Sequence, residues 1–370
     1  MKLMEEIKKF FMTPKNLILL VAGPLFFTFL FGMVYRNDYL NDIPTAILDM
    51  DKSANSRMLV TEFEQNDRYS VKYFPSNTEG LRELIENKKV HAALFIPPDF
   101  DQDIKKGKGT KAALFIDGSN IAIGNNALSS GLEILNTVNG GIHMNLLQAK
   151  GVPPRLSENY AKIFEFESRV LWDPKLSYKY YIIPGIVIMV VQQLFLSAFT
   201  PNFVADPKNI LEKSFIHAFM GAFTYLLCLF MLENIVGIHL NGNPLIASGL
   251  MGVYLLCLIG ISMVIGSLLR NPLKVTQFCM MLSVPTMLTA GYIWPSFAVP
   301  KWTEILVKIF WPLTYILSPI RDFLIKGRFP EGFITNFMQL LAFGLGWAVL
   351  GYFLMKKQLK TQKREESEIG

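Results

Sequence analysis

The sequence predicts a polytopic α-helical membrane protein with six transmembrane helices. It also predicts an extracytoplasmic α/β domain between spans 1 and 2, and short re-entrant helices between spans 5 and 6. Three observations indicate this fold class. Apolar residues make up 51% of the 370 residues, which is typical of a membrane protein with a sizeable polar part. They gather in long runs that Lys and Arg flank, and one polar segment of domain size interrupts the series.

The membrane flanks explain the net charge of +6. Three lysines, Lys2, Lys8 and Lys9, precede Pro14, and Lys15 follows it. A second basic group, 356–364, follows the last apolar run. Cytoplasmic segments beside membrane spans carry an excess of Lys and Arg. We therefore expect both termini in the cytoplasm and no nucleic-acid partner.

Residues 1–13 are predicted to form an amphipathic helix on the cytoplasmic face of the bilayer. Its apolar residues recur on one stripe: Leu3, Met4, Ile7, Phe10 and Phe11. Pro14 ends this helix. Residues 14–35 are predicted to be the first span, because Leu17–Tyr35 lacks charge over nearly the length of about 20 residues that a bilayer requires.

Residues 36–177 are predicted to form the extracytoplasmic domain. The β-rich runs are Ile43–Leu48, Tyr69–Phe74, His91–Ile96 and Ala112–Ile116, and the helical stretches between them are Ser53–Glu64, Thr78–Glu86 and Asp99–Lys106. This alternation predicts βαβ units and a mixed or parallel sheet. A long helix, Asn120–Ala149, and a second around Ser157–Ser168 are expected to return the chain to the membrane.

Nothing in the sequence predicts catalysis or a bound cofactor. Asp49, Asp51 and Asp117 follow predicted strands, where acids usually cap helices and form turns. The three cysteines all lie in apolar runs, and their spacing fits neither a disulfide framework nor a zinc site. Nucleotide-binding, nucleophile-elbow and HExxH motifs are missing from the sequence. We expect no catalytic residue, no metal site and no cofactor in this chain.

Residues 178–355 are predicted to hold spans 2 to 6, and residues 356–370 a cytoplasmic tail. The apolar runs are Tyr178–Phe199, Phe215–Leu232, Leu245–Leu268, Val275–Ala290 and Phe333–Met355. The basic residues of Thr200–Lys213 and Arg270–Lys274 predict that these two connections are cytoplasmic.

A few polar and small residues stand out in and beside these runs. Gln192 and Gln193 lie at mid-depth, where amides either join helices or line a substrate path. Glu233 lies at the edge of a span in a short external loop, where it is either hydrated or involved with substrate or protons. Ser262 and Gly266 form a small-xxx-small step suited to close helix packing.

The stretch Gly291–Gly327 is apolar and aromatic, but four prolines interrupt it and exclude a single spanning helix. We expect two short helices, Lys301–Phe310 and Ser318–Lys326, that enter and leave the outer leaflet within a re-entrant stretch, 295–327. Non-helical backbone at that depth is tolerated only against protein or a wet cavity. The stretch is therefore predicted to line or cover a substrate path.

The candidate residues of this path or gate are Gln192, Gln193, Glu233, Tyr292, Trp294, Trp311, Tyr315 and Arg321. Arg321 is either a packing anchor or part of an exit gate. A charge in lipid is costly unless it pairs or reaches headgroups, so we expect Arg321 either to reach headgroup phosphates or to pair with an acid. Asp322 is adjacent, and Glu304 and Glu331 are alternatives.

The same stretch resembles the end of the permease subunit of an ATP-binding-cassette (ABC) exporter of the type 2 class. The matching residues are Thr289–Pro295, Pro300, Trp311–Tyr315, Arg321, Leu324 and Gly327. Further matches to this class are Pro14, Gly23–Leu25, Phe31-Gly32, Gly266–Asn271, Gln277 and Pro285. The large polar segment is similar to the external domain of one subclass at Ile47–Ser53, Ala92–Phe100 and Phe115–Asn120.

The resemblance implies that a separate ATPase subunit binds ATP and Mg and hydrolyses ATP. It also implies that the cytoplasmic turn Thr200–Lys213 contacts this ATPase, although the turn departs from the family's usual Glu-, Arg- and Gly-rich sequence. The residues that we assign to this contact are Phe203, Lys208, Ile210, Lys213 and Arg270. Phe203 and Ile210 are the expected apolar anchors.

A permease of this class is expected in the bacterial cytoplasmic (inner) membrane, in contact with lipid. Because six spans enclose little space alone, a second permease subunit is implied, in a homodimer or a heterodimer. The apolar, aromatic lining suggests an amphipathic cargo such as a drug or a lipid. The alternative is a non-transporting receptor or anchor that displays the external domain, as in membrane proteins that serve phage attachment.

Overall fold

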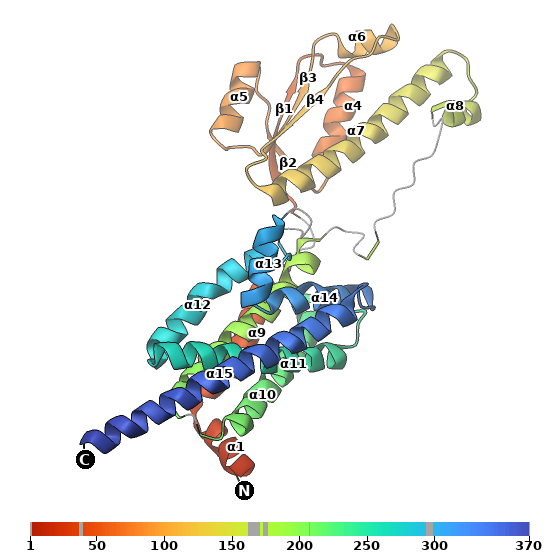
Figure 1. The fold of residues 1–370 in the computed structure, drawn as a ribbon. Helices are drawn as coiled ribbons and strands as arrows, with labels where there is room; N and C mark the ends of the chain where they lie inside the picture. Colours follow the sequence, from red (N-terminus) through yellow and green to blue (C-terminus); the bar gives the residue numbers. More distant parts are fainter. Residues whose placement is uncertain are drawn as a thin grey trace. The chain divides into compact units, whose positions relative to one another are not determined.

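The computed structural model describes residues 2–36, 40–161, 171–172, 177–206, 208–293 and 299–369. The chain forms two compact units (Figure 1). The helical unit comprises Met1–Arg36 and Lys179–Gly370, and the α/β unit comprises Asn37–Tyr178. Each unit has a hydrophobic core of its own.

The α/β unit contains a four-stranded mixed sheet in the order β2-β1-β3-β4. The strands are β1 (Ile43–Asp49), β2 (Tyr69–Tyr73), β3 (Ala92–Ile96) and β4 (Ala113–Ile116). β1 pairs in parallel with β2 and β3, and β4 is antiparallel to β3. The predicted strands and the mixed sheet are therefore confirmed, with ends that agree within one residue.

The helices of this unit are α4 (Ala54–Gln65), α5 (Thr78–Glu86), α6 (Phe100–Lys105), α7 (Ile121–Ala149) and α8 (Pro154–Ala161). The first four agree with the prediction. The expected second return helix begins earlier, at Pro154, and its last part lies outside the described residues. Helices cover both faces of the sheet, with α5 on one face and α4 and α7 on the other (Figure 1).

Strand side chains alternate between the two faces. Ile47 and Leu94 belong to the core beneath α4 and α7, whereas Leu48 and Ala93 pack against Leu81 of α5. The two hydrophobic layers make the sheet the centre of an independent core.

Asp49 and Asp117 form turns after their strands, which is one of the two roles that the sequence predicted. Asp49 accepts hydrogen bonds from the backbone of Asp51 and Lys52, each at 3.0 Å, and from the Ser56 hydroxyl at 2.8 Å. Asp117 accepts one from the backbone of Ser119 at 2.9 Å and lies 3.1 Å from His91. The bonds from Ser119 and then His91 lower the pKa of Asp117 to about 2. Within the described ranges, no group of three His, Cys, Asp or Glu residues is arranged to hold a metal ion.

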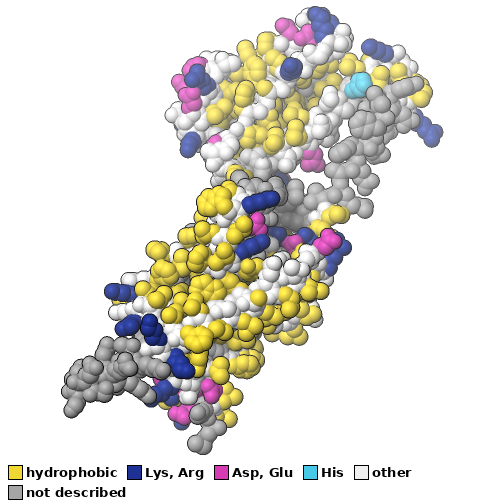
Figure 2. Space-filling view, in the orientation of Figure 1, with side chains coloured by type: hydrophobic (Ala, Val, Ile, Leu, Met, Phe, Trp, Pro, Cys, Tyr) yellow, Lys and Arg dark blue, Asp and Glu magenta, His cyan; other side chains and the backbone are white. Residues whose placement is uncertain are grey.

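The helical unit is a multi-pass membrane protein. Five of its described helical segments are long and apolar enough to span a bilayer: Pro14–Val34, Lys179–Ala205, Ile210–Val236, Pro244–Leu269 and Phe333–Lys357. The first consists of α2 (Pro14–Leu17), the π-helical turn η1 (Ile18–Ala22) and α3 (Gly23–Val34). Figure 2 shows hydrophobic side chains over the visible surface of these helices, as expected for contact with lipid.

The remaining helices are α1 (Lys2–Met12), α9 (Tyr178–Ala205), α10 (Ile210–Met231) with η2 (Leu232–Val236), α11 (Pro244–Leu269), α12 (Pro272–Thr289), α13 (Lys301–Phe310), α14 (Leu313–Lys326) and α15 (Phe333–Ile369). The run predicted as the fifth span forms α12. This helix has 18 residues and is not among the five segments above, so the count of six spans stays a prediction.

Two sequence-based boundaries are wrong. α9 continues to Ala205 and α10 begins at Ile210, so among the described residues of the expected turn Thr200–Lys213 only 206, 208 and 209 are not helical. α14 begins at Leu313 rather than Ser318, because Pro312 takes the N-cap position and Pro319 is accommodated, buried, inside the helix. Burial of this face outweighs the interior-proline penalty of about 3 kcal/mol. The tail continues α15 as a helix, since no Pro or Gly occurs between Tyr352 and Ile369.

Small residues set the spacing of α11 from its neighbours. The predicted small-xxx-small step packs against α9. Ser262 accepts a hydrogen bond from Thr200 at 3.2 Å, and a Cβ atom on Gly266 would lie 2.8 Å from Val204. A closer contact with α15, at Gly260, was not predicted. There a Cβ atom would lie 2.5 Å from the backbone nitrogen of Ala348 and 2.7 Å from the carbonyl carbon of Trp347.

We expect Gly260→Ala to destabilise the protein by about 1–3 kcal/mol, the usual cost of overpacking, because backbone atoms of α15 cannot rotate away. Gly249→Ala on the same helix is the matched control, since a Cβ atom there meets nothing within 4 Å. Thermal unfolding in detergent measures both. Equal melting temperatures for the two variants would contradict this account of the α11–α15 contact.

Candidate functional site

Side chains from three segments meet beside the first turns of α9. Tyr181 belongs to α9, Tyr292 follows α12, and Arg321, Asp322 and Lys326 belong to α14. We call these five residues the tyrosine–arginine cluster. The sequence pointed to Tyr292 and Arg321 and named Asp322 as a partner, whereas it gave no role to Tyr181 or Lys326.

Tyr292 is only 2% exposed, and its ring stacks on that of Tyr181 with centroids 5.6 Å apart. Its hydroxyl accepts a hydrogen bond from the backbone of Gly185 at 2.8 Å and donates to the carbonyl of Tyr181. In return, the Tyr181 hydroxyl donates to the carbonyls of Tyr292 and Ile293. The two tyrosines therefore join α9 to the segment after α12 in both directions.

Arg321 lies over both aromatic rings. Its guanidinium carbon is 5.2 Å from the centre of the Tyr292 ring and 5.5 Å from that of Tyr181, which is within cation–π range. Its Nε and Nη2 atoms donate to one oxygen of Asp322 at 3.0 and 2.8 Å, and Lys326 donates to the other oxygen at 2.9 Å. The expectation that Arg321 pairs with an acid is confirmed, and Asp322 is that acid.

The end of α14 is held by the loop that follows η2. The carbonyl of Leu324 accepts hydrogen bonds from the backbone of Asn241 at 2.8 Å and of Gly242 at 3.1 Å. Gly327 ends the helix with φ 72°, a left-handed conformation that favours glycine. Arg321 and Asp322 are thus carried on a helix that is fixed at its C-terminus.

An open cavity of about 240 Å³ adjoins Asp322 and is lined by residues at the ends of α12 and α15 and by residues of α13 and α14. Its polar lining includes Glu304, Lys308, Ser318, Asp322, Glu331 and Asn336. Glu304 and Lys308 form an ion pair at 2.6 Å. Residues of the predicted stretch therefore line part of a cavity that carries charged groups, and their role in a substrate path stays a prediction.

The other predicted path residues do not all belong to the cluster. Trp311 and Tyr315 are buried where α13 meets α14, and the Tyr315 hydroxyl donates to the carbonyl of Lys308 at 3.1 Å. Trp294 lies outside the described residues. Glu233 is half-buried in η2.

Gln192 is buried between α9 and α11 and accepts a hydrogen bond from the hydroxyl of Tyr254. This contact joins two helices, which is one of the two roles that the sequence left open. Its amide nitrogen and both polar atoms of Gln193 are buried with no hydrogen-bond partner. A substrate-path role for these amides stays a prediction.

The predicted ATPase contact changes once the turn is seen as two helix ends. Phe203 is 4% exposed and stacks on Phe199 inside the helical core, so it is not the exposed anchor that we expected. Ile210 is half-buried, and Lys213 forms an ion pair with Asp206 at 2.7 Å. This bond to Lys213 lowers the pKa of Asp206. Lys208 and Arg270 are exposed.

The N-terminal helix α1 is attached to this turn, which the sequence did not predict. Glu6 is 4% exposed and accepts hydrogen bonds from Asn209 at 3.0 Å and from Lys9 at 3.4 Å. Phe10 packs edge-on against His217 of α10. No local pattern marks Glu6, because its partner Asn209 is remote in sequence. Leu3, Met4 and Phe11 of the predicted apolar stripe remain exposed.

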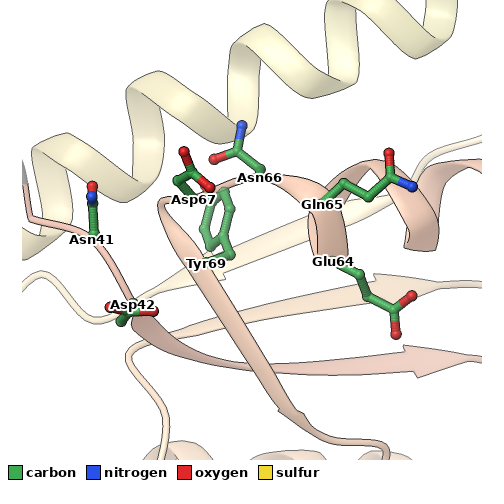
Figure 3. A pocket seen from close by; sticks show the side chains of 7 residues that line it. All are labelled: Asn41, Asp42, Glu64, Gln65, Asn66, Asp67 and Tyr69. Carbon is green, nitrogen blue, oxygen red and sulfur yellow. The ribbon is translucent and has the colours of Figure 1, made fainter.

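The α/β unit has a separate polar pocket of about 290 Å³ at the ends of α4 and β2 (Figure 3). The carboxylate of Glu64 points away from those of Asp42 and Asp67. The Tyr69 hydroxyl donates to the carbonyl of Ala127, and burial raises the pKa of Tyr69 to about 12. Because the polar groups do not converge, we assign no function to this pocket.

Residues 15–353 match the family described as "ABC-2 family transporter protein". The chain belongs to this family. It is accordingly an ABC transporter permease, and the match covers the helical spans and the α/β unit alike. The tyrosine–arginine cluster and the cavity lie within the matched residues.

Several curated relatives align over most of this ABC-2 permease. It is 20% identical to the probable multidrug ABC transporter permease YbhS of Escherichia coli, over 96% of each chain. It is 23% identical to the linearmycin resistance permease protein LnrN of Bacillus subtilis, over 96% of this chain and 97% of that protein. The probable multidrug ABC transporter permease YbhR of Escherichia coli is 20% identical over 86% and 85%.

We expect Arg321 and Asp322 to be energetically coupled, because their side chains are only 20% and 17% exposed. A double-mutant cycle of Arg321→Gln and Asp322→Asn, measured by thermal unfolding in detergent, should give a coupling of about 1–2 kcal/mol.

The matched control for this cycle is the exposed pair Arg82–Glu86, at 2.7 Å in α5. Its coupling should not exceed about 0.5 kcal/mol. Equal coupling energies for the two pairs would contradict the view that burial strengthens the Arg321–Asp322 pair.

Proposed function

We propose that this chain is the permease subunit of an ATP-driven exporter that moves an amphipathic substrate, such as a drug or a lipid, out across the bacterial cytoplasmic membrane. The family assignment carries this proposal. Relatives named for multidrug transport and for linearmycin resistance support the substrate class. A separate ATPase subunit binds ATP and Mg and drives the cycle.

The proposed topology has six spans, with α12 as the fifth. An α-helix rises about 1.5 Å per residue, so the 18 residues of α12 extend for about 27 Å, slightly less than the bilayer core of about 30 Å. Both termini, residues 206–209 and the turn at Arg270 lie in the cytoplasm. The α/β unit lies outside the cell, and α13 and α14 form the re-entrant stretch at the outer leaflet.

A second permease subunit completes the transport path. The described cavity in the helical unit, about 240 Å³, is below the range of about 300–1,000 Å³ that is usual for a drug-sized ligand. A path wide enough for an amphipathic molecule therefore forms between two permeases. The half-buried Gln193 and the tyrosine–arginine cluster are the residues that we assign to this path and its outer gate.

The turn after α9 and the exposed Arg270 form the proposed ATPase contact, together with α1. Lys208 and Arg270 offer exposed positive charge, and the bonds of Glu6 and Asn202 attach the start of the chain to the same turn. A force on this surface therefore acts on α1 and α9 together. The alternative of a non-transporting receptor is weaker, because the permease relatives match over nearly the whole chain.

The topology predicts opposite accessibility for two exposed positions, Ser76 in the α/β unit and Lys274 at the start of α12. In intact cells, an impermeant maleimide should label Ser76→Cys and leave Lys274→Cys unlabelled until the cells are opened. The native cysteines Cys228, Cys257 and Cys279 are buried and give a low background. Labelling of Lys274→Cys but not Ser76→Cys in intact cells would reverse the topology.

An ATPase should co-purify with the full chain and be released by the double variant Lys208→Glu with Arg270→Glu, since both charges are reversed at the proposed contact. Loss of two rim charges should weaken binding about tenfold or more. Lys301→Glu changes an exposed lysine of α13 and should leave the complex intact. Retention of the ATPase by the double variant would show that the contact lies elsewhere.

A further inference from the structure

The hydroxyl of Tyr292 occupies an unusual place in α9. An uninterrupted α-helix pairs each backbone N–H with the carbonyl four residues earlier, which would pair Gly185 with Tyr181. The Tyr292 oxygen accepts from Gly185 and donates to the Tyr181 carbonyl. We call this arrangement the Tyr292 bridge.

Two residues of α9, Pro184 and Gly185, make room for the Tyr292 bridge. Pro184 has no backbone N–H, so it leaves the carbonyl of Tyr180 without its helical donor. Gly185 has no Cβ atom, and a Cβ atom there would overlap the ring of Tyr292. Pro184 therefore interrupts the helical hydrogen bonds one residue before Gly185, and Gly185 leaves the space that the ring of Tyr292 fills.

The bridge connects two parts of the proposed transport machinery. Beyond Gly185, α9 continues to Ala205, next to the turn that contains Lys208. Gly185 and Ala205 are about 30 Å apart along the helix, at 1.5 Å per residue. Tyr292 begins the stretch whose residues line part of the cavity, and Arg321 lies 5.2 Å from its ring. The helix α9 therefore extends from the proposed ATPase contact to the proposed outer gate. Tyr292 lies where α9 meets this gate.

We propose that Tyr292 is a positioning residue that transmits movement of α9 to the outer gate through its hydroxyl bridge to Gly185 and Tyr181. This inference rests on the proposed function. While the bridge is intact, the start of α9, the segment after α12 and Arg321 move as one body. Without it, only the ring stacking and the bonds of the Tyr181 hydroxyl join α9 to the segment after α12, and the backbone at Gly185 is no longer attached to the gate.

Two variants remove the bridge in different ways. Tyr292→Phe keeps the ring, its stacking on Tyr181 and its contact with Arg321, and loses only the hydroxyl. Gly185→Ala keeps the hydroxyl but displaces the ring. Tyr180→Phe is the matched control, because the hydroxyl of this neighbouring tyrosine bonds to the backbone of His239 at 3.0 Å and not to the segment after α12.

The reporter is a single cysteine at Glu331, an exposed residue that lines the cavity. In the complex of the full chain with its ATPase, the maleimide labelling rate of Glu331→Cys is measured without nucleotide and with ATP plus vanadate. We expect the rate to change about fivefold or more, the lower end of common coupling strengths. The Tyr180→Phe background should behave in the same way, whereas the Tyr292→Phe and Gly185→Ala backgrounds should lose this change while ATP hydrolysis continues.

The outcomes are distinct. Loss of the ATP-dependent change in Tyr292→Phe, with a melting temperature and ATP hydrolysis like those of the parent, supports the positioning role. A change of the same size in Tyr292→Phe overturns it and leaves the proposed function standing. A parent chain that associates with no ATP-hydrolysing subunit overturns the proposed function itself. If Gly185→Ala melts early, Tyr292→Phe alone decides.

Discussion

Backbone hydrogen bonding without water is the constraint on which the helical unit depends. An unsatisfied amide or carbonyl in a bilayer costs several kcal/mol, so each break in a helix needs a partner from elsewhere in the fold. In the first turns of α9, the hydroxyl of Tyr292 bonds to the amide of Gly185 and to the carbonyl of Tyr181. At the end of α14 the partners are the amides of Asn241 and Gly242. The candidate gate lies where these hydrogen bonds bring together α9, the segment after α12 and α14.

Charged side chains are paired with other side chains at both ends of the helical unit. Arg321 is placed over two aromatic rings and against Asp322, which Lys326 also contacts. At the other end, Glu6 bonds to Asn209 and Lys9, and Asp206 pairs with Lys213. A buried charge whose partner is removed is strongly destabilising. These pairs therefore hold α1, the α9–α10 turn and α14 in defined positions, which a transporter needs if force is to pass between its ends.

The α/β unit is stabilised mainly by its own apolar core. Its sheet is stabilised by two apolar layers beneath helices, and Asp49 and Asp117 accept hydrogen bonds in turns. The polar pocket at Asp42 does not bring its carboxylates together (Figure 3). The candidate gate lies in the helical unit, and the α/β unit also belongs to the matched family region.

The sequence by itself determined the elements whose signals are local. Alternating β-rich and helical runs located every strand of the mixed sheet, and apolar runs located the five candidate spans. The start of α13 after Pro300 was located correctly, whereas α14 was predicted to begin at Ser318, five residues too late. These signals need only neighbouring residues, since hydrogen-bond patterns and apolar length are properties of a short segment.

Only the tertiary structure decided which remote residues meet. Tyr181 and Tyr292 are 111 positions apart, Glu6 and Asn209 are 203 apart, and no periodicity in the chain relates them. Phe203 was expected at a surface because its turn follows a predicted span, yet packing against Phe199 and α11 buries it. The reason is physical: burial and hydrogen-bond partners depend on how helices pack, and packing depends on side chains that the sequence places far apart.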